Sequence, residues 1–480
     1  MLYAESWEFN YERDETKRYG ERLQISVGYA PDLLETCNGL AIREQEGNSG
    51  QLHKAIIDNL HNNRPVLIYL DAYWTIWGNR YLTGHFPHFT LIVGYNESNH
   101  NFYCVDPIFS EQIQELPVDH FIRGNNGKLL SISRPHIDFT PTANWDTALR
   151  TFNHIIDNTK LPEFEQFIQD ITASFDFKRE MEGYEEYWET PFYKNFNQGM
   201  FGRKSCADAI EFISSYVPVV EPVARLARQI AYEWAILRNV IQKLSLVIDD
   251  TLFELYNHRL LDKLKLVFAL ERDFVHMIKL VLKHGCVPSY ENTAPAMKWN
   301  PHNATASLEH TTFVDLSCHF NNKGLKISAA CTANFDGTGD YIAERETPLD
   351  KLYKASHFKF PEAGPGCNDN IICMGQSIDV PAGEYACIMI AATSEWGDSI
   401  EKLTVKYEHK NSDFDIEISD WIVINPRFNH QILWKGSNKL AEPVNLYMQE
   451  IPIYEEKMYA VTLPYNPNLH IFSLSLVKKS

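Results

Sequence analysis

Gly84–Pro107, with the sequence GHFPHFTLIVGYNESNHNFYCVDP, decides how the first part of the chain is interpreted. Two short apolar runs, Phe89–Val93 and Phe102–Val105, flank a polar turn, and this pattern is typical of a β-hairpin. The first run follows His88, and the second run ends on Asp106. Because antiparallel pairing brings these two ends side by side, the sequence predicts a carboxylate next to an imidazole.

A histidine that is held by a carboxylate can accept a proton from a thiol or a hydroxyl. We therefore take His88 and Asp106 as candidate catalytic residues, although a purely structural pair has the same pattern. His85 and His88 also form an H-x2-H pair, to which Cys104 could add a thiol. Zinc needs three or four ligands, and no local cluster completes such a set, so we predict no metal site and no cofactor.

Cys37 is the only cysteine that precedes His88 in the chain. A nucleophilic cysteine of the papain type lies at a helix N-terminus, where the helix dipole stabilises the thiolate. Cys37 instead falls at the end of a short expected helix, just before Gly39, where the dipole disfavours a thiolate. We expect Cys37 to be a small apolar core residue and not a nucleophile.

Composition narrows the class of protein. The 480 residues exceed what one hydrophobic core holds, so we expect two or three domains. A net charge of −19 argues against binding to nucleic acid or to an anionic membrane surface. The first residues show no secretory signal, and no apolar run is long enough to span a membrane. Nine scattered cysteines without a CxxC pair favour reduced thiols and a cytoplasmic location.

Patterning divides the chain into three regions and predicts a multidomain α+β protein. Residues 1–135 alternate short strands and helices, residues 136–290 are helical, and residues 300–480 have the period of two that is typical of an antiparallel β-sandwich. In the helical region we expect a long helix that starts near Pro222, a second one over Thr251–His284, and an irregular connection over Phe177–Arg203. In the sandwich we expect a strand at Trp421–Ile424 and a turn at Pro381–Gly383.

Several segments of residues 1–135 resemble the butirosin-biosynthesis acyltransferase N-terminal domain family. They are Ser6-Trp7-Glu8-Phe9-Asn10-Tyr11, Pro65–Leu70 with Asp71-Ala72-Tyr73, His88-x4-Val93-Gly94-Tyr95, and Val105-Asp106-Pro107. The resemblance implies a papain-like fold and transfer of an acyl group from a carrier protein to an amine. It also implies that His88 is the general base and that Asp106 orients it. The family's nucleophilic cysteine lies upstream of the Ser-Trp-x-Phe segment, which begins here at Ser6, so we expect the nucleophile to be missing from this chain as given.

The last region more loosely resembles a β-sandwich that is appended to bacterial glycoside hydrolases and is related to carbohydrate-binding modules. The matching pieces are Phe320-Asn321-Asn322-x-Gly324, Phe335-Asp336-Gly337-x-Gly339, Asp369-Asn370, Gly375-Gln376-x-Ile378 and Asp420-Trp421. In such modules Trp396 or Trp421 would stack on a sugar ring. Because aromatic residues of a sandwich usually belong to its core, we expect core packing for these side chains.

These observations lead to one functional hypothesis with two rivals. The first is an accessory acyltransferase-like protein of nonribosomal peptide or polyketide biosynthesis, which transfers or hydrolyses a carrier-bound acyl thioester or is inactive in this form. Its partners would be an acyl or peptidyl carrier protein and an amine or peptide acceptor. The rivals are a non-catalytic scaffold that binds a carrier protein or carbohydrate, and a papain-like cysteine peptidase.

Overall fold

The computed structural model describes most of the chain, with gaps at its ends and in several loops. The described residues are 7–26, 31–78, 81–106, 112–134, 140–247, 250–284, 311–326, 332–343, 358–360, 366–422, 426, 428, 430–439, 441–454 and 456–478. Ser6, Pro107 and the expected boundary at residues 290–300 therefore lie outside the described residues. Mixed α+β structure, a helical middle region and antiparallel sheets toward the C-terminus confirm the expected fold class.

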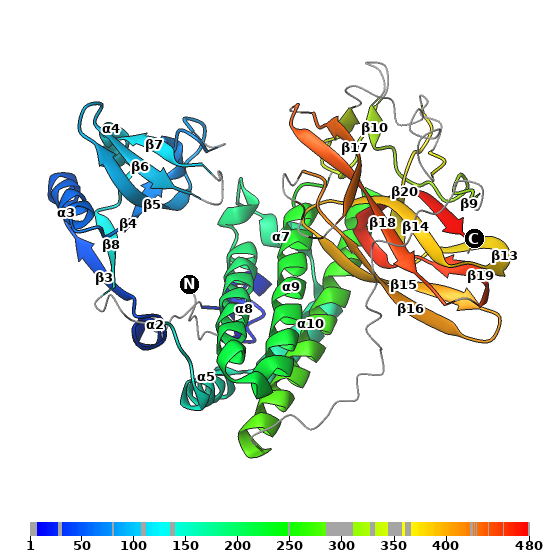
Figure 1. Ribbon diagram of the computed structural model, residues 1–480, viewed down its shortest axis with the longest axis horizontal. Helices are drawn as coiled ribbons and strands as arrows, with labels where there is room; N and C mark the ends of the chain where they lie inside the picture. The colour runs from blue at the N-terminus through cyan, green and yellow to red at the C-terminus, as the bar shows by residue number, and fades with distance from the viewer. Residues whose placement is uncertain are drawn as a thin grey trace.

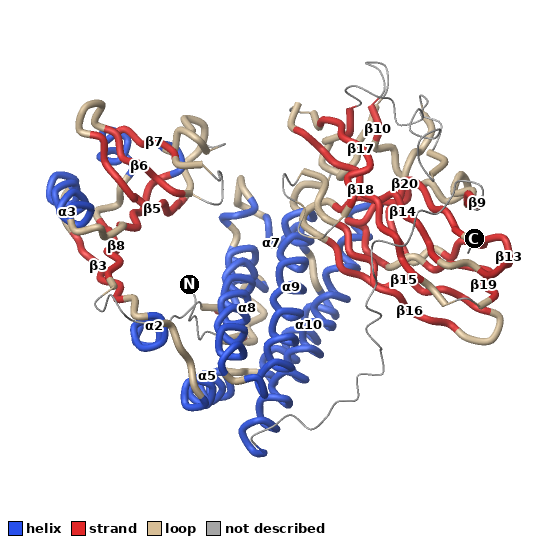
Figure 2. Tube along the Cα trace, in the orientation of Figure 1, coloured by secondary structure: helices blue, strands red, loops and turns tan. Residues whose placement is uncertain are grey.

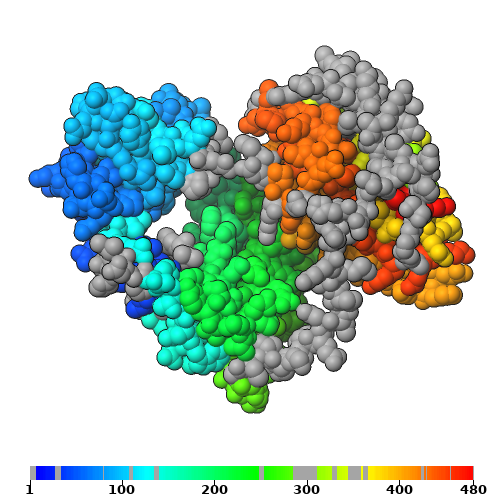
Figure 3. All heavy atoms as spheres, in the orientation of Figure 1, coloured from blue at the N-terminus to red at the C-terminus, as the bar shows by residue number. Residues whose placement is uncertain are grey.

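A small α+β unit follows the first described residues and forms a lobe of its own (Figures 1 and 3). Its antiparallel sheet has the strand order β3-β8-β4-β5-β6-β7. The elements are β3 (Ala41–Glu46), α3 (Ser49–His61), β4 (Val66–Asp71), η1 (Ala72–Trp74), β5 (Pro87–Asn96), β6 (Asn101–Val105), β7 (Gln114–Pro117), α4 (Val118–Gly124) and β8 (Lys128–Ser133). The preceding helix α2 (Pro31–Asn38) lies outside the lobe, where Cys37 packs with Ala209 of the helical region (Figure 1).

The sheet buries one face of its central strands. Along β4 buried residues alternate with half-buried ones, and Val66, Ile68 and Leu70 share a core with Leu52 and Ile56 of α3. Alternation of this kind follows from the period of two in a strand. A register shift lies between Ile92 and Gly94, where β5 pairs with β6, so the expected hairpin contains a β-bulge.

The first described residues do not belong to this unit, although we expected residues 1–135 to form one domain. Residues 7–26 form β1 (Asn10–Tyr11), α1 (Tyr19–Arg22) and β2 (Leu23–Gln24). Trp7 and Phe9 are 1 % exposed and share one hydrophobic core with the helices that follow the sheet unit. Trp7 stacks on Phe274 with ring centroids 4.5 Å apart. The correction has a simple cause, because these aromatic side chains find their largest apolar surface on the helices.

The helical region packs around that shared core. Its elements are α5 (Trp145–Asn158), α6 (Leu161–Ser174), α7 (Phe177–Met181), η2 (Tyr187–Glu189), α8 (Pro191–Tyr216), η3 (Pro218–Val220), α9 (Glu221–Leu244) and α10 (Asp250–His284). Pro222 lies in the first turn of α9, as expected. At Gly199 of α8 an added Cβ would lie 2.4 Å from the Trp234 ring, so this glycine permits the close approach of α8 and α9. Among the described helices none is long and apolar enough to cross a membrane.

The expected irregular connection over Phe177–Arg203 is wrong. The chain there forms α7, η2 and the first half of α8. The Thr190 side chain accepts a hydrogen bond from the Tyr193 backbone, and Pro191 occupies the first turn of α8. Phe192 and Phe196 are buried in the shared core. Because this stretch is rich in acidic and aromatic residues, its sequence pattern did not reveal a capped helix with a normal apolar face.

The C-terminal region is a β-sandwich of two sheets beside α9 and α10 (Figures 1 and 2). The larger sheet has the order β10-β11-β17-β18-β14-β20-β12 with β9 paired to β20, and the smaller sheet has the order β13-β19-β15-β16. The strands are β9 (Thr311–Phe313), β10 (Leu325–Lys326), β11 (Ile342–Ala343), β12 (Ile371–Met374), β13 (Ser377–Glu384), β14 (Cys387–Ser394), β15 (Ser399–Tyr407), β16 (Asn411–Ile418), β17 (Gln431–Ser437), β18 (Pro443–Pro452), β19 (Lys457–Thr462) and β20 (Tyr465–Val477).

Two details of the sandwich differ from the sequence predictions. Pro381–Gly383 is not a turn between strands, because β13 runs through it with a register break between Asp379 and Gly383. Trp421–Ile424 is not a strand in its described part. Asp420 makes only an isolated bridge with Ser394, and Trp421 begins a turn. Both differences arise where the hydrogen-bond ladder between paired strands is interrupted. A pattern of alternating residues does not reveal such an interruption.

Candidate functional site

The structure brings His88 and Asp106 together. His88 lies near the start of β5, and Asp106 follows the last residue of β6. The His88 Nε2 and Asp106 Oδ2 atoms are 2.6 Å apart, and the two residues are 5 % and 1 % exposed. The expected contact at the end of the hairpin is therefore present.

Trp77 makes a second hydrogen bond to the same carboxylate oxygen. Its indole Nε1–H donates to Asp106 Oδ2 over 2.8 Å. Asp106 Oδ2 therefore accepts from Trp77 and faces the His88 ring at the same time. Two partners on one oxygen fix the carboxylate, and the carboxylate in turn fixes the imidazole. Trp77 was not identified from the sequence, because a tryptophan in the β4–β5 loop has no fixed spacing to an aspartate after β6.

His85 belongs to a different pair. Its Nδ1 atom lies 2.6 Å from Asp71 Oδ2, and its ring stacks on Tyr73 with centroids 4.6 Å apart. Asp71 also accepts the backbone N–H groups of Tyr73 and Phe86. Burial raises the pKa of Asp71, but the hydrogen bonds from His85 and the two amides outweigh it and hold that pKa below its ordinary value. The His85 side chain is 72 % exposed, so this pair lies at the surface of the lobe.

The two histidines of the H-x2-H pair thus use separate carboxylates. Within the described parts of the chain, no group of three or more His, Cys, Asp or Glu side chains is arranged to hold a metal ion. The geometry of this pair therefore gives no support to a zinc site at His85 and His88.

Neither Cys104 nor Cys37 has the surroundings of a nucleophile. Cys104 is fully buried in the core of the sheet unit, and burial raises the pKa of its thiol to about 12. Cys37 is buried against Ala209 of α8, as expected for a small apolar side chain. Neither residue therefore has the setting of a nucleophile for the His88–Asp106 pair.

The candidate sugar-stacking residues of the sandwich differ in exposure. Trp421 is 4 % exposed and packs on Phe335 with ring centroids 4.6 Å apart. That ring belongs to the core, as we expected. Trp396 is half-buried, and its backbone carbonyl accepts a hydrogen bond from the Asn239 side chain of α9. Trp396 therefore lies where the sandwich meets the helices.

The loop before His88 exposes apolar side chains. Ile76, Leu82 and Phe86 are 42 %, 52 % and 44 % exposed, and all three belong to the segment that joins η1 to β5. His88 itself is 5 % exposed, so these side chains, and not the ring, form the accessible apolar surface of this segment. An imidazole that a carboxylate holds can move a proton.

Comparison with known proteins matches only the last region. Residues 310–480 match the family model of the AziU2-like β-sandwich domain, which supports the expected C-terminal β-sandwich. The match covers about the same residues as β9–β20 and does not reach the His88 lobe. No curated protein matches the chain.

Proposed function

We propose that this chain is an accessory acyltransferase-like protein of nonribosomal peptide or polyketide biosynthesis that acts in the cytoplasm. The hydrogen-bonded His88–Asp106 pair is the observation that carries the proposal. The segments of residues 1–135 that resemble the butirosin acyltransferase family supply the substrate class. The partners are an acyl or peptidyl carrier protein and an amine or peptide acceptor.

His88 acts as a general base on the acceptor. Asp106 holds the ring through Nε2, and the oriented imidazole takes the proton of the attacking amine. The amine nitrogen forms a bond to the thioester carbonyl carbon, and the carbon–sulfur bond then breaks. His88 returns the proton to the departing thiolate, which leaves an amide and a free carrier thiol. With water in place of the amine, the same steps give hydrolysis.

This route agrees with the chemistry of the cysteine that lies in β6, two residues before Asp106. The thiol of Cys104 has a pKa raised to about 12 by burial, so it does not supply a thiolate at neutral pH. The exposed apolar side chains Ile76, Leu82 and Phe86 offer a surface for the acyl or carrier arm. Direct attack by the acceptor needs only an oriented base and a bound thioester.

A matched pair of variants tests the proposal. The rate of acyl transfer from a carrier-bound thioester to an amine is measured for the wild type, His88→Gln and His85→Gln. Loss of general-base catalysis lowers the rate of His88→Gln by about 100-fold or more. His85→Gln removes a surface histidine that also pairs with a carboxylate, and it keeps the rate within about threefold of the wild type. Equal rates for the wild type and His88→Gln would exclude the catalytic role of His88.

A non-catalytic scaffold is the second candidate, and the low exposure of His88 favours it. Only 5 % of the residue is exposed, so a substrate has little direct access to the ring in this conformation. A pull-down with the carrier protein, together with a glycan array, separates the candidates. Carrier or glycan binding without turnover by the wild type would favour the scaffold over the transferase.

A further inference from the structure

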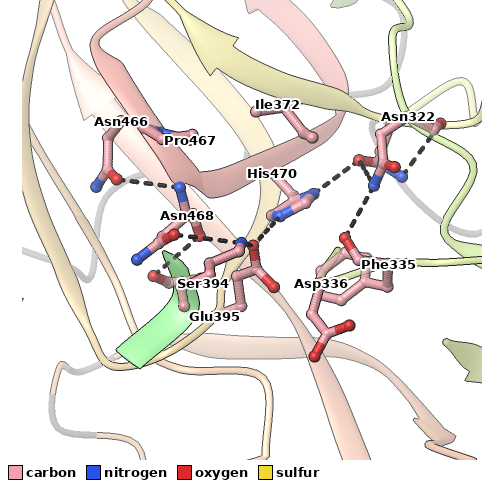
Figure 4. A network of polar contacts seen from close by, with 12 residues as sticks. Asn322, Phe335, Asp336, Ile372, Ser394, Glu395, Asn466, Pro467, Asn468 and His470 are labelled. Atoms are coloured by element: carbon pink, nitrogen blue, oxygen red, sulfur yellow. Dashed lines mark hydrogen bonds and ion pairs between the residues drawn. The ribbon is translucent and has the colours of Figure 1, made fainter. Parts of the chain in front are cut away.

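A network of buried polar side chains lies in the sandwich around Glu395 and His470 (Figure 4). His470 of β20 and Glu395, which follows β14, are both 0 % exposed. The ring atom His470 Nε2 lies 3.1 Å from Glu395 Oε1. Lys243, near the end of α9 and also 0 % exposed, donates to the same Oε1 atom. Three ionisable groups from distant parts of the sequence therefore meet in one buried site.

At the other end of this network, the contacts of Asp369 fix the orientation of the Asn370 side-chain amide. Asp369 is a carboxylate that accepts the backbone N–H groups of Gly324 and Leu325 and the ammonium of Lys323. The Asn370 Nδ2 atom lies 2.8 Å from Asp369 Oδ1, so the amide nitrogen of Asn370 must face that acceptor. The Asn370 Oδ1 atom then faces His470.

The tautomer of His470 follows from this orientation. His470 Nδ1 lies 2.8 Å from Asn370 Oδ1, which accepts and does not donate. Nδ1 therefore carries a proton. The ring also lies 4.1 Å from the Phe335 ring, and burial together with the neighbouring Lys243 holds the pKa of His470 well below its ordinary value. In its neutral form, His470 presents the lone pair of Nε2 to Glu395.

A lone pair that faces an ionised carboxylate at 3.1 Å is repulsive, so this contact favours a neutral Glu395, and His470 Nε2 itself has no hydrogen-bond partner among the described residues. A second feature agrees with a neutral Glu395. Its Oε2 atom is buried and has no hydrogen-bond partner within the described residues. An ionised oxygen without a donor is costly in a dry interior, whereas a carboxylic acid is not charged.

We propose that Glu395 is a buried carboxylic acid that lies against the neutral ring of His470, and that this protonated group closes the junction between α9 and the sandwich. The acid accepts a hydrogen bond from Lys243 on the oxygen that faces His470 Nε2. Protonation thus links the helical region to the AziU2-like β-sandwich domain. The inference is independent of the function proposed for His88.

All charged groups around the site act on this proton. Burial raises the pKa of Glu395 to about 8, although Lys243 lowers it in part and Asp336 adds to the rise. Burial also lowers the pKa of Lys243 and raises that of Tyr256 on α10. The groups that face the site from the packed elements are Lys243 of α9, Tyr256 of α10, Asp336 before β11, Asp369 before β12, His470 of β20, and Asp420 after β16, whose pKa burial raises to about 6.

The free energy of unfolding depends on pH with a definite sign. A pKa that rises from 4.5 to about 8 on folding means that the folded chain binds more protons than the unfolded chain between these values. The stabilisation by Glu395 is complete below about pH 4.5 and is lost as the pH rises through about 8. An ionised Glu395 would show the opposite trend, because its stabilisation would be lost only at acidic pH.

Infrared spectroscopy of the full chain tests the proton directly. At pH 7 we expect a carboxylic-acid C=O band that shifts in D2O, titrates near pH 8 and is absent from Glu395→Gln. Thermal unfolding gives a second readout. The difference in unfolding temperature between the wild type and Glu395→Gln falls between pH 6 and pH 8, by on the order of 2 °C per pH unit.

Glu271→Gln is the matched control. Glu271 is also a buried glutamate, but it accepts only donors, from Arg203 Nε and Nη2 and from Trp234 Nε1. Its variant should lower the unfolding temperature by a constant amount between pH 6 and pH 9. The proposal is wrong if the wild type shows no acid band that Glu395→Gln removes, or if the Glu395→Gln difference is as constant with pH as that of the control.

Discussion

The described residues include two buried pairs of a histidine and a carboxyl group, and the partners around them differ. In the small α+β unit, Asp106 Oδ2 faces His88 and accepts a hydrogen bond from the neutral indole of Trp77. At the junction of α9 and the sandwich, Glu395 meets His470 together with the ammonium of Lys243. The neighbours of the two pairs therefore differ in charge, and the two proposals assign the pairs different roles.

The difference lies in the donors that each carboxyl group meets. Asp106 Oδ2 has its partners from a loop and a strand, and its Oδ1 atom is buried with no hydrogen-bond partner among the described residues, as Oε2 of Glu395 is. His470 donates from Nδ1 to Asn370, so its other nitrogen presents a lone pair to Glu395. Under the two proposals, the first pair passes a proton to a substrate and the second pair holds one.

The same substitution at both histidines should separate the two roles most strongly. His470→Leu removes the Nδ1–H donor from Asn370 Oδ1, which keeps a donor from Asn322, and puts an apolar side chain against Glu395 Oε1, which keeps Lys243, so it should lower the free energy of unfolding by about 2 kcal/mol. His88→Leu leaves Asp106 with its Trp77 donor and should cost about 1 kcal/mol. Denaturant unfolding of the full chain measures both values. Acyl transfer should be lost only in His88→Leu, and equal losses of stability would mean that both pairs are structural.

A titration into acid should sharpen the comparison. The pKa of His470 is lowered on folding by burial and by Lys243, so its contribution is present above pH 6.5 and is lost as the pH falls below that value. The advantage of the wild type over His470→Leu should shrink by at most about 1.4 kcal/mol per pH unit between pH 6.5 and pH 5. Unfolding curves at several pH values check this slope. A flat difference would mean that His470 carries the same charge in both states.

Trp77→Phe should give the smallest effect. The variant removes one donor to Asp106 Oδ2 and keeps the aromatic ring in the core. The expected loss of stability is about 1 kcal/mol. Acyl transfer should fall by less than tenfold, because the His88 contact to Asp106 remains. A loss as large as that of His88→Gln would show that Trp77 touches the substrate.

The sequence predicted the His88–Asp106 contact because one hairpin makes it. Residues near the ends of paired strands meet by register, and the turn between β5 and β6 is short. Trp77 could not be found in the same way, since its position depends on the path of the β4–β5 loop. The junction was missed entirely, because Lys243, Glu395 and His470 come from three elements that only tertiary packing brings together.

The same reasoning explains the fold predictions. The apolar periodicity of α9 and α10 and the alternation of the sandwich strands are local signals, and the structure confirms them. The place of Trp7 and Phe9 is not a local signal. The alternation of apolar and polar residues around Trp7 and Phe9 fits a strand of the sheet unit or a strand on the helices. Packing on the helices decides between the two.

The path of the chain has a consequence for its biosynthesis. Residues 7–26 pack on helices that follow the α+β unit, so that unit interrupts the helical body between β2 and α5. On the ribosome, the lobe with His88 has all of its strands before α10 has been made. Trp7 meets Phe274 only when the last long helix emerges. Until then the core that Phe9 and Tyr11 share with the helices is incomplete, so apolar surface of the nascent chain stays uncovered.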